Sequence, residues 1–274
     1  MKIKGISHFK VELIKNKEGY FIRKSGGSRL ERQSEKQHYY YCMLNTEENL
    51  HNLFEVPDVL DAEWAGNDFS FIMNFYNGKN ILDILEYGDV TLIEDIINKL
   101  FLYLKWEIKE STYTEVNEQI LDKLKDIKNY IKDKDILKKI DSIDKYVQAH
   151  NIRVPVGVCH GDFTFSNMIF SNKIVLIDWL DSFIETPIQD ITKLMQEVNL
   201  RWSLLMVDGD VRDTTKINIG YEYLEKEIKE RIKLDFLSYQ EQIKLFYLIT
   251  LIRIVPYITH KSVFNNVKRG ILKG

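Results

Sequence analysis

The first part of the chain alternates between apolar and polar residues with the period of a β-strand. Residues 9–14 and 20–24 follow this pattern, and the turn-forming residues 16–19 separate them. A further β-rich run covers residues 69–73, and residues 30–44 can form a helix between these strands. Runs of this kind bounded by turn residues are typical of strands. We therefore expect a small β-rich part over residues 1–74.

The hydrophobic period changes after Gly78. Apolar residues then recur every three or four positions, which predicts amphipathic helices. This spacing is clear in two stripes: Leu92, Ile93, Ile96, Ile97, Leu100, Phe101 and Leu104, followed by Ile120, Leu121, Leu124, Ile127 and Ile131. Residues 188–206 and 220–255 are also expected to be helical. The pattern predicts an α+β chain with a connector near residues 73–78 and a larger, mainly helical part over residues 75–274.

Glycine and proline are scarce in this chain. The 274 residues include 13 Gly and 4 Pro, too few turn-forming residues for a many-stranded sandwich or propeller. The sequence contains neither GxGxxG nor GxxxxGK[ST]. A nucleotide would therefore not be bound by a Rossmann or Walker loop.

Charge and cysteine usage exclude several further classes. The net charge of −3 lacks the basic excess that drives nucleic-acid binding. The most apolar stretch, residues 245–258, is interrupted by Arg253 and Pro256, so we expect no membrane span. Cys42 and Cys159 are far apart and lack metal-ligand spacing. We expect both to be buried thiols in a reducing compartment, and the protein to be cytoplasmic.

Residues 154–179 interrupt the helical pattern and carry the chemistry. An apolar strand leads into a polar loop, and two short apolar strands, 168–170 and 174–177, follow. If Asn172-Lys173 forms a two-residue hairpin loop, Asn167 lies directly opposite Asp178. Directly opposed residues have Cβ atoms about 4.5–5.5 Å apart, close enough for an amide oxygen and a carboxylate to share one cation.

Few oxygen ligands suit Mg²⁺, which keeps its other positions for water and phosphate oxygens. Asp162 precedes Asn167 by five residues on the same loop, where it could accept a proton while Asn167 and Asp178 hold the metal. A metal that neutralises phosphates and a carboxylate that deprotonates a hydroxyl are the components of phosphoryl transfer.

The same residues resemble the active site of a known family. His160-Gly-Asp162-Phe-Thr-Phe-Ser-Asn167 is similar to the HxDxxxxN catalytic loop of the aminoglycoside phosphotransferase and choline kinase-like families, and Ile177-Asp178-Trp179 to their metal-binding segment. The resemblance implies a two-lobed protein-kinase-like fold. It also implies that Asp162 is the catalytic base, that His160 supports the loop, and that Asn167 and Asp178 bind Mg²⁺.

Weaker similarities extend over the rest of the chain. Residues 71–78 resemble the last strand and hinge of the N-lobe, whose backbone would hold adenine near Asn74 and Tyr76. Residues 20–24 resemble the strand that carries a phosphate-binding cation. Either Arg23 or Lys24 could be that cation, because alternate residues of a strand point to opposite faces.

Further residues are assigned from the same resemblance. In the following helix, Glu35 is the expected ion-pair partner of the cation, with Glu31 as the second choice. Asp190 is expected to brace the catalytic loop, and a turn over residues 5–8 to cover the phosphates. Leu180 stands where the family often has a second acidic residue, so the number of metal ions remains open.

These observations predict a kinase that transfers the γ-phosphate of ATP or GTP, with Mg²⁺, to a hydroxyl group of a small molecule. A sugar, an amino alcohol and an aminoglycoside are all possible acceptors. Asp181, Glu185, Trp202 and residues 208–213 are the expected lining of the acceptor pocket. The alternatives are a kinase-like binding module without catalysis and a metal-dependent phosphoesterase. The sequence leaves the oligomeric state open.

Overall fold

The computed structural model describes residues 2–3, 9–205, 214–258 and 260–274. The chain folds into two compact units. One contains residues 1–83 and 165–181, and the other contains residues 84–164 and 182–274. The expected fold class, with strands gathered in the N-terminal part and helices in the C-terminal part, is confirmed.

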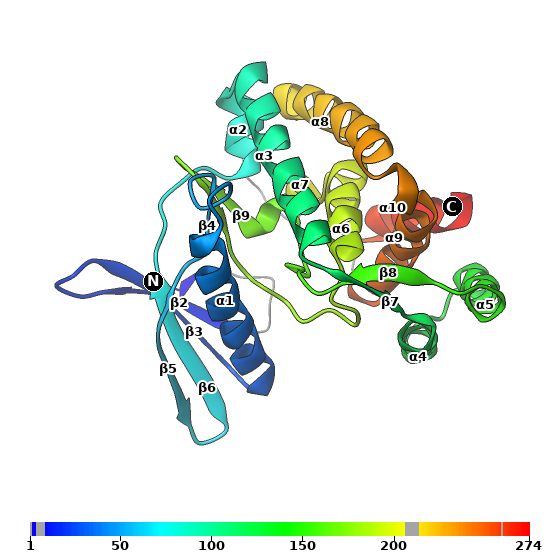
Figure 1. The fold of residues 1–274 in the computed structure, drawn as a ribbon, viewed down its shortest axis with the longest axis horizontal. Coiled ribbons are helices and arrows are strands. Elements are labelled where there is room, and N and C mark those ends of the chain that lie inside the picture. Colours follow the sequence, from blue (N-terminus) through cyan, green and yellow to red (C-terminus); the bar gives the residue numbers. More distant parts are fainter. Residues whose placement is uncertain (1, 4–8, 206–213, 259) are drawn as a thin grey trace. The chain divides into compact units, whose positions relative to one another are not determined.

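The first unit is built on a five-stranded antiparallel sheet, whose strands β2, β3, β6 and β5 are prominent in Figure 1. The order along the sheet is β1-β2-β3-β6-β5. The strand bounds are β1 Lys2–Ile3, β2 Lys10–Lys15, β3 Tyr20–Gly26, β5 Val59–Ala65 and β6 Asp68–Asn74. The sequence predicted β2, β3 and β6 to within two residues at each end, but it missed β5, which is mostly exposed and therefore lacks a clear alternation.

Helix α1, Ser28–Thr46, covers one face of this sheet (Figure 1). Its inward residues follow the helical repeat and include Leu30, Tyr40 and Leu44. Leu30 joins a small core with residues from β3 and β6: Ile22, Phe69, Phe71 and Met73. Burial of this apolar face stabilises α1 on the sheet.

The first unit also includes a β-hairpin from much later in the sequence. Strands β9 (Met168–Phe170) and β10 (Ile174–Leu176) pair with each other, and β10 runs parallel to β4 (Phe54–Glu55). A bridge between Lys79 and Phe170 adds two backbone hydrogen bonds of 2.8 Å. The boundary expected after residue 74 therefore differs from the observed division, because this pairing ties residues 165–181 to the N-terminal unit.

The register of this hairpin corrects the sequence prediction. Phe170 pairs with Ile174, not with Val175, so the loop has three residues instead of two. The Ser171 amide and hydroxyl groups both donate to the Lys173 carbonyl and close this longer loop. A shift of one residue changes which residues oppose each other. Asn167 therefore lies beside Ile177, whose amide donates to the Asn167 carbonyl over 3.0 Å.

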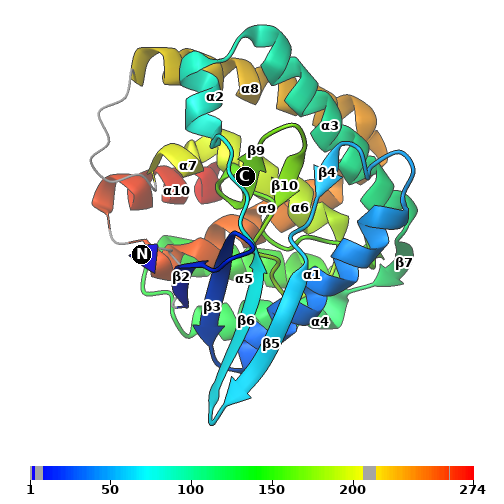
Figure 2. The same cartoon turned by 90° about the vertical axis from the view of Figure 1, so that its left-hand side faces the viewer.

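The second unit is mainly helical, and α6 lies at its centre. The apolar stripe from Leu92 forms α3, and helix α6 packs against α3, α8 and α9 (Figure 2). The helix bounds are α2 Ile81–Tyr87, which spans the division between the units, α3 Val90–Lys109, α4 Asn117–Lys128, α5 Lys134–Ala149, α6 Pro187–Leu200, α7 Trp202–Leu205, α8 Thr214–Asp235, α9 Gln240–Ile254 and α10 Lys261–Lys273. Three 3₁₀ turns also occur: Phe165–Asn167 in the first unit, and Leu237–Tyr239 and Val255–Tyr257 in the second. Strands β7 (Thr112–Glu115) and β8 (Arg153–Val156) pair beside these helices.

Several helix boundaries differ from the predicted ones. The helix expected over residues 220–255 is two helices, because the chain breaks at a 3₁₀ turn after α8. The sequence reading did not identify α2 or α10.

Other expectations concern the cysteines and the membrane. Cys159 is buried as expected, but Cys42 is exposed, because it lies on the outer face of α1. Across the described residues, no helix combines the length and apolar character needed to cross a membrane.

Candidate active site

Lys24 on β3 forms an ion pair with Asp178, which follows β10. The Lys24 side chain shares a face with Ile22 and lies next to Phe71, and the residue is only 6 % exposed. Burial lowers the pKa of Lys24 to about 8, because a charged ammonium group is costly away from water. Asp178 has a positive φ of 62°, a conformation that non-glycine residues adopt at a cost. This turn ends the strand and aims the carboxylate at the ammonium group.

Of the two candidate cations, Lys24 is the one that points inward. Arg23 occupies the opposite face of β3, as strand alternation requires. Its Nε atom is buried without a hydrogen-bond partner among the described residues. Within the described residues, Lys24 forms an ion pair and Arg23 does not.

The ion pair expected between this cation and Glu35 is not found among the described residues, where Lys24 pairs with Asp178 instead. Glu35 lies on the exposed face of α1, one position beyond the buried Ser34. Glu31, the second choice, accepts a hydrogen bond from the Trp64 indole over 2.9 Å. Helix α1 therefore contacts residues 179–181 through side chains other than Glu31 and Glu35.

Helix α1 holds the three residues that follow Asp178. The Tyr40 ring stacks on Trp179 with ring centroids 4.1 Å apart. Lys36 donates to the Leu180 carbonyl over 2.7 Å, and Arg32 pairs with Asp181 over 2.8 Å. Because these contacts come from one rigid helix, α1 fixes the backbone next to the Asp178 carboxylate.

Asn167 and Asp178, the two expected Mg²⁺ ligands, both lie in the first unit, on either side of the β9–β10 hairpin. Asn167 is 8 % exposed, and its backbone is paired with Ile177, the neighbour of Asp178. One amide oxygen and one carboxylate form a hard-oxygen donor pair, which suits an ion that completes its shell with phosphate oxygens and water. Within the described ranges, no three His, Cys, Asp or Glu side chains form a cluster able to hold a metal.

The segment that follows β6 is shaped by two close contacts. Asn74 ends the strand, opposite Phe21. The Tyr76 hydroxyl donates to Glu55 over 2.6 Å, and burial together with this carboxylate raises the Tyr76 pKa. A Cβ atom at Gly78 would lie 2.7 Å from the Phe170 carbonyl oxygen, so only glycine fits there. Asn74 and Tyr76 are thus held beside β4 and β9.

In the second unit, the catalytic loop is held by Asp190 of α6. The buried Asp190 carboxylate accepts hydrogen bonds from the His160 and Gly161 amides, the latter over 2.8 Å. Gly161 has a φ of 91°, which glycine adopts without strain. Thr186 caps the first turn of α6 by accepting a hydrogen bond from the Ile188 amide. This contact fixes the start of the helix, which carries Asp190.

His160 is fully buried and supports the loop from inside. Its Nδ1 atom accepts a hydrogen bond from the Asp162 amide over 3.3 Å. The ring meets Phe163 edge-on, and Phe163 stacks on Tyr103 of α3. This environment fits a structural role in positioning Asp162.

The sequence reading missed Lys193, which pairs with Asp162. Its ammonium group lies 3.0 Å from the carboxylate, and the two side chains are 12 % and 26 % exposed. Lys193 follows Asp190 by three positions, so both project from neighbouring positions of one helix face. That spacing from Asp190 is the signal that could have identified it.

The residues expected to line an acceptor pocket have other partners. Asp181 pairs with Arg32, and Glu185 accepts from the Ser182 amide over 2.7 Å. Trp202 begins the short helix α7. Residues 5–8 and 208–213, expected to cover phosphates and to line the pocket, lie outside the described residues.

Comparison with known proteins supports the resemblance seen in the motifs. Residues 98–224, a little under half of the chain, match the model of the phosphotransferase enzyme family. This range includes the catalytic loop, Asp178 and α6. No curated protein matches the sequence.

Solved structures with the same fold cover nearly all of the chain. A thermostable mutant of the aminoglycoside phosphotransferase APH(4)-Ia, in complex with AMP-PNP and hygromycin B, is 12% identical with a TM-score of 0.65, covering 100% of this chain and 92% of that one. A fructosamine-3-kinase described as putative, from Haemophilus somnus, is 14% identical with a TM-score of 0.55, covering 100% and 90%. A glucosamine kinase bound to glucosamine, ADP and phosphate is 8% identical with a TM-score of 0.52, covering 96% and 75%. The protein-kinase-like phosphotransferase fold is confirmed.

Proposed function

We propose that this chain, which has the protein-kinase-like phosphotransferase fold, is a Mg²⁺-dependent kinase that transfers the γ-phosphate of ATP or GTP to a hydroxyl group of a small molecule. The observation that carries the proposal is the ion pair between the buried Lys24 and the partly exposed Asp178. Burying an ammonium group is costly, and a structural pair at this position could be replaced by apolar residues. If Lys24 contacts the phosphates of a nucleotide beside a candidate metal ligand, its positive charge has a function. That function explains why an apolar residue does not stand at this position.

The first unit would hold the nucleotide. Lys24 would contact its phosphates, and Asn167 and Asp178 would hold Mg²⁺. When bound, Mg²⁺ neutralises the charge of the phosphate oxygens. The backbone around Asn74 and Tyr76 would hydrogen-bond the purine base. Helix α1 would keep Asp178 oriented through its contacts with residues 179–181.

The second unit would supply the base. The Asp162 carboxylate accepts the proton of the acceptor hydroxyl as the oxygen attacks the γ-phosphorus atom. The bond between the γ-phosphorus and the bridging oxygen breaks, and the nucleoside diphosphate leaves. His160 and Asp190 hold the loop backbone, while Lys193 directs the Asp162 carboxylate through their ion pair before the acceptor arrives.

Two measurements test this function. Mg²⁺ with ATP or GTP should raise the melting temperature of the wild type, and should raise that of Asp178→Ala much less. Phosphate transfer to a panel of small alcohols, with Asp162→Ala as the blank, should then identify an acceptor. Absence of a melting shift with either nucleotide would contradict a kinase. Phosphate release from monoesters without nucleotide would instead favour a phosphoesterase.

Two of the solved structures with the same fold contain a small polar molecule, hygromycin B in one and glucosamine in the other. Both molecules carry several hydroxyl groups. A hydroxylated small molecule is therefore the acceptor class that we propose for this chain.

A further inference from the structure

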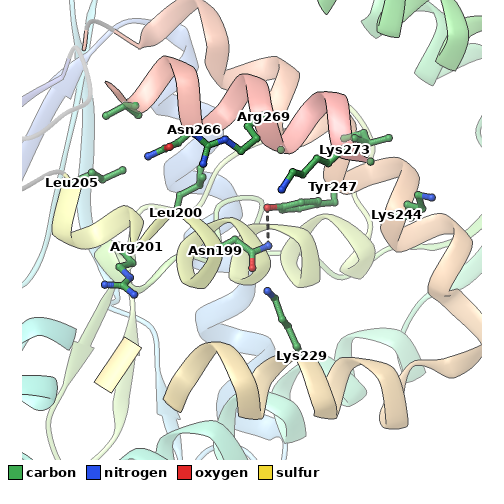
Figure 3. Close-up of a pocket in the computed structure, with 14 residues that line it drawn as sticks. Asn199, Leu200, Arg201, Leu205, Lys229, Lys244, Tyr247, Asn266, Arg269 and Lys273 are labelled. Carbon is green, nitrogen blue, oxygen red and sulfur yellow. Dashed lines mark hydrogen bonds between the residues drawn. The ribbon is translucent and has the colours of Figure 1, made fainter. Parts of the chain in front are cut away.

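The second unit contains a cavity of about 690 Å³ that neither the motifs nor the proposed mechanism uses. It is formed where the end of α6 faces α8, α9 and α10 (Figure 3). Residues from helices α6 to α10 line it, among them Asn199, Leu200, Lys229, Tyr247, Arg269 and Lys273.

The lining is strongly basic. It includes Arg201, Lys229, Lys244, Arg269 and Lys273, and none of the described lining residues is acidic. Figure 3 shows Arg269 and Lys273 on α10, with Lys229 on α8 across the cavity. Like charges gathered around one concave surface raise the local concentration of anions.

Three of these cations have no acidic partner among the described residues. Lys229 is paired with Glu225, and Arg201 lies 3.6 Å from Glu222. For Lys244, Arg269 and Lys273, the described part of the chain offers no ion pair, so their charge is uncompensated within it. All three residues are exposed, so an anionic ligand can reach their side chains.

The floor of the cavity contains one buried polar atom that has no hydrogen-bond partner among the described residues. The Asn199 amide donates to the Tyr247 hydroxyl over 2.7 Å (Figure 3). The Asn199 Oδ1 atom is buried with no hydrogen-bond partner in the described residues, and burial also raises the Tyr247 pKa. Tyr247 therefore keeps its proton available to donate, and Asn199 can accept from a hydroxyl group. This combination suits a ligand that carries both an anionic group and hydroxyl groups.

Helix α6 connects the cavity with the proposed base. Lys193 contacts Asp162, and Leu200 lies seven residues further on the same helix face. Seven residues span about 10 Å along a helix axis. The cavity and the residue that contacts Asp162 are therefore about two helical turns apart on α6.

We infer that this cavity binds the acceptor through an anionic group, so that the acceptor is a small hydroxylated compound bearing a phosphate or a carboxylate. This inference rests on the proposed kinase function. It differs from the expectation that Asp181, Glu185, Trp202 and residues 208–213 line the acceptor pocket.

The first experiment measures binding without nucleotide, using the full chain and calorimetric titration. The probes are glucose 6-phosphate, gluconate, glucose and glucosamine. We compare the wild type with Arg269→Glu/Lys273→Glu and with the matched control Lys138→Glu/Lys261→Glu, whose side chains lie outside the cavity. Melting temperatures verify folding, and Arg269→Gln/Lys273→Gln serves if the charge reversal unfolds the protein.

We expect at least one of the two anionic probes to bind the wild type, and to bind at least tenfold more weakly after charge reversal in the cavity. The control should remain within twofold of the wild type. Glucose 6-phosphate and gluconate distinguish a phosphate from a carboxylate as the recognised group. Equal binding by the cavity variant, tighter binding of glucosamine than of both anions, or no binding of either anion would overturn the inference.

A second experiment separates this inference from the proposed function. Transfer of labelled γ-phosphate is measured with the same four compounds, with Asp162→Ala as the blank. Phosphorylation of an anionic probe that needs Arg269 and Lys273 supports the inference, whereas phosphorylation of only glucose or glucosamine overturns it. If anions bind but no compound is phosphorylated and Mg²⁺-nucleotide does not stabilise the protein, the kinase function fails. The acceptor role then fails with it, while the cavity is still shown to bind anions.

Discussion

Lys24 and Asp178 are separated by 154 positions in the sequence, and they form an ion pair within the N-terminal unit. The pair depends on two backbone features. Strand β3 directs Lys24 into the core, and the positive φ of Asp178 turns its carboxylate out of the line of β10. Neither feature follows from the identity of the two residues. Each is set by the backbone of the segment in which the residue lies.

Lys24→Met should reduce phosphate transfer by about 10²–10³-fold, the loss typical of removing one group that stabilises transition-state charge. The melting temperature should change little, because the substitution also removes the cost of burying an ammonium group. Steady-state kinetics and thermal denaturation check both expectations. Arg23→Met is the matched control, because Arg23 occupies the opposite face of the same strand. A larger loss of transfer with Arg23→Met would reverse the assignment of the phosphate-binding cation.

Asp162→Asn should lower the turnover number by about 10²–10⁴-fold, as expected for loss of a general base. Its stabilisation by Mg²⁺-ATP should match that of the wild type, because Asp162 is not among the residues proposed to hold the nucleotide. Lys193→Met should cause a smaller loss of turnover, since the carboxylate remains. Single-turnover measurements separate these effects on chemistry from product release. Normal turnover by Asp162→Asn would exclude it as the base.

Asp190→Asn should destabilise the protein by about 1–3 kcal/mol, the range for buried groups that lose a hydrogen-bond partner. The Asp190 carboxylate accepts from two backbone amides, and an asparagine side chain can satisfy only one of them with its oxygen. Urea denaturation measures the free energy of unfolding. Asp181→Asn, on a partly exposed side chain, should have a smaller effect. Equal losses would contradict the bracing role of Asp190.

Lys36→Met and Tyr40→Leu should weaken binding of Mg²⁺-nucleotide, because both residues hold the segment after Asp178. We expect the KM for Mg²⁺-ATP to rise several-fold, and the double variant to be less than additive because the two contacts share one segment. Glu35→Gln, on the exposed face of the same helix, should behave as the wild type. Unchanged KM values in both single variants would show that α1 does not orient Asp178.

Asp133→Ala should destabilise helix α5 by about 1 kcal/mol, because Asp133 caps the helix by accepting from two of its amides. Lys268 holds the Asp133 pKa below its usual value of 3.8, so the folded state binds a proton less readily than the unfolded state. The stability from this pair is present above pH 3.8 and is lost as the pH falls through the lowered pKa. Urea denaturation between pH 3 and pH 7 measures the free energy of unfolding. This free energy should fall less at acidic pH for Asp133→Ala than for the wild type. Parallel curves would contradict this.

Much of the architecture could be predicted because it depends on local spacing. The stripe from Leu92 formed α3, and the alternation in residues 20–24 formed β3. The hairpin register could not be predicted, because a three-residue and a two-residue loop suit the same sequence. The backbone hydrogen bonds of Ser171 and the pairing of β10 with β4 decided between them.

The sequence by itself determined the residue types and order of the catalytic motif, from His160 to Asp178, since spacing along one segment is a local property. It also placed Asp190 with the catalytic loop through the family resemblance. Only the tertiary structure selected Lys24 over Arg23, left Glu35 exposed, joined Lys193 to Asp162 and gathered cations around a cavity. Each of these depends on which faces of separate elements pack together, and that is decided by burial of apolar surface across the fold rather than by neighbouring residues.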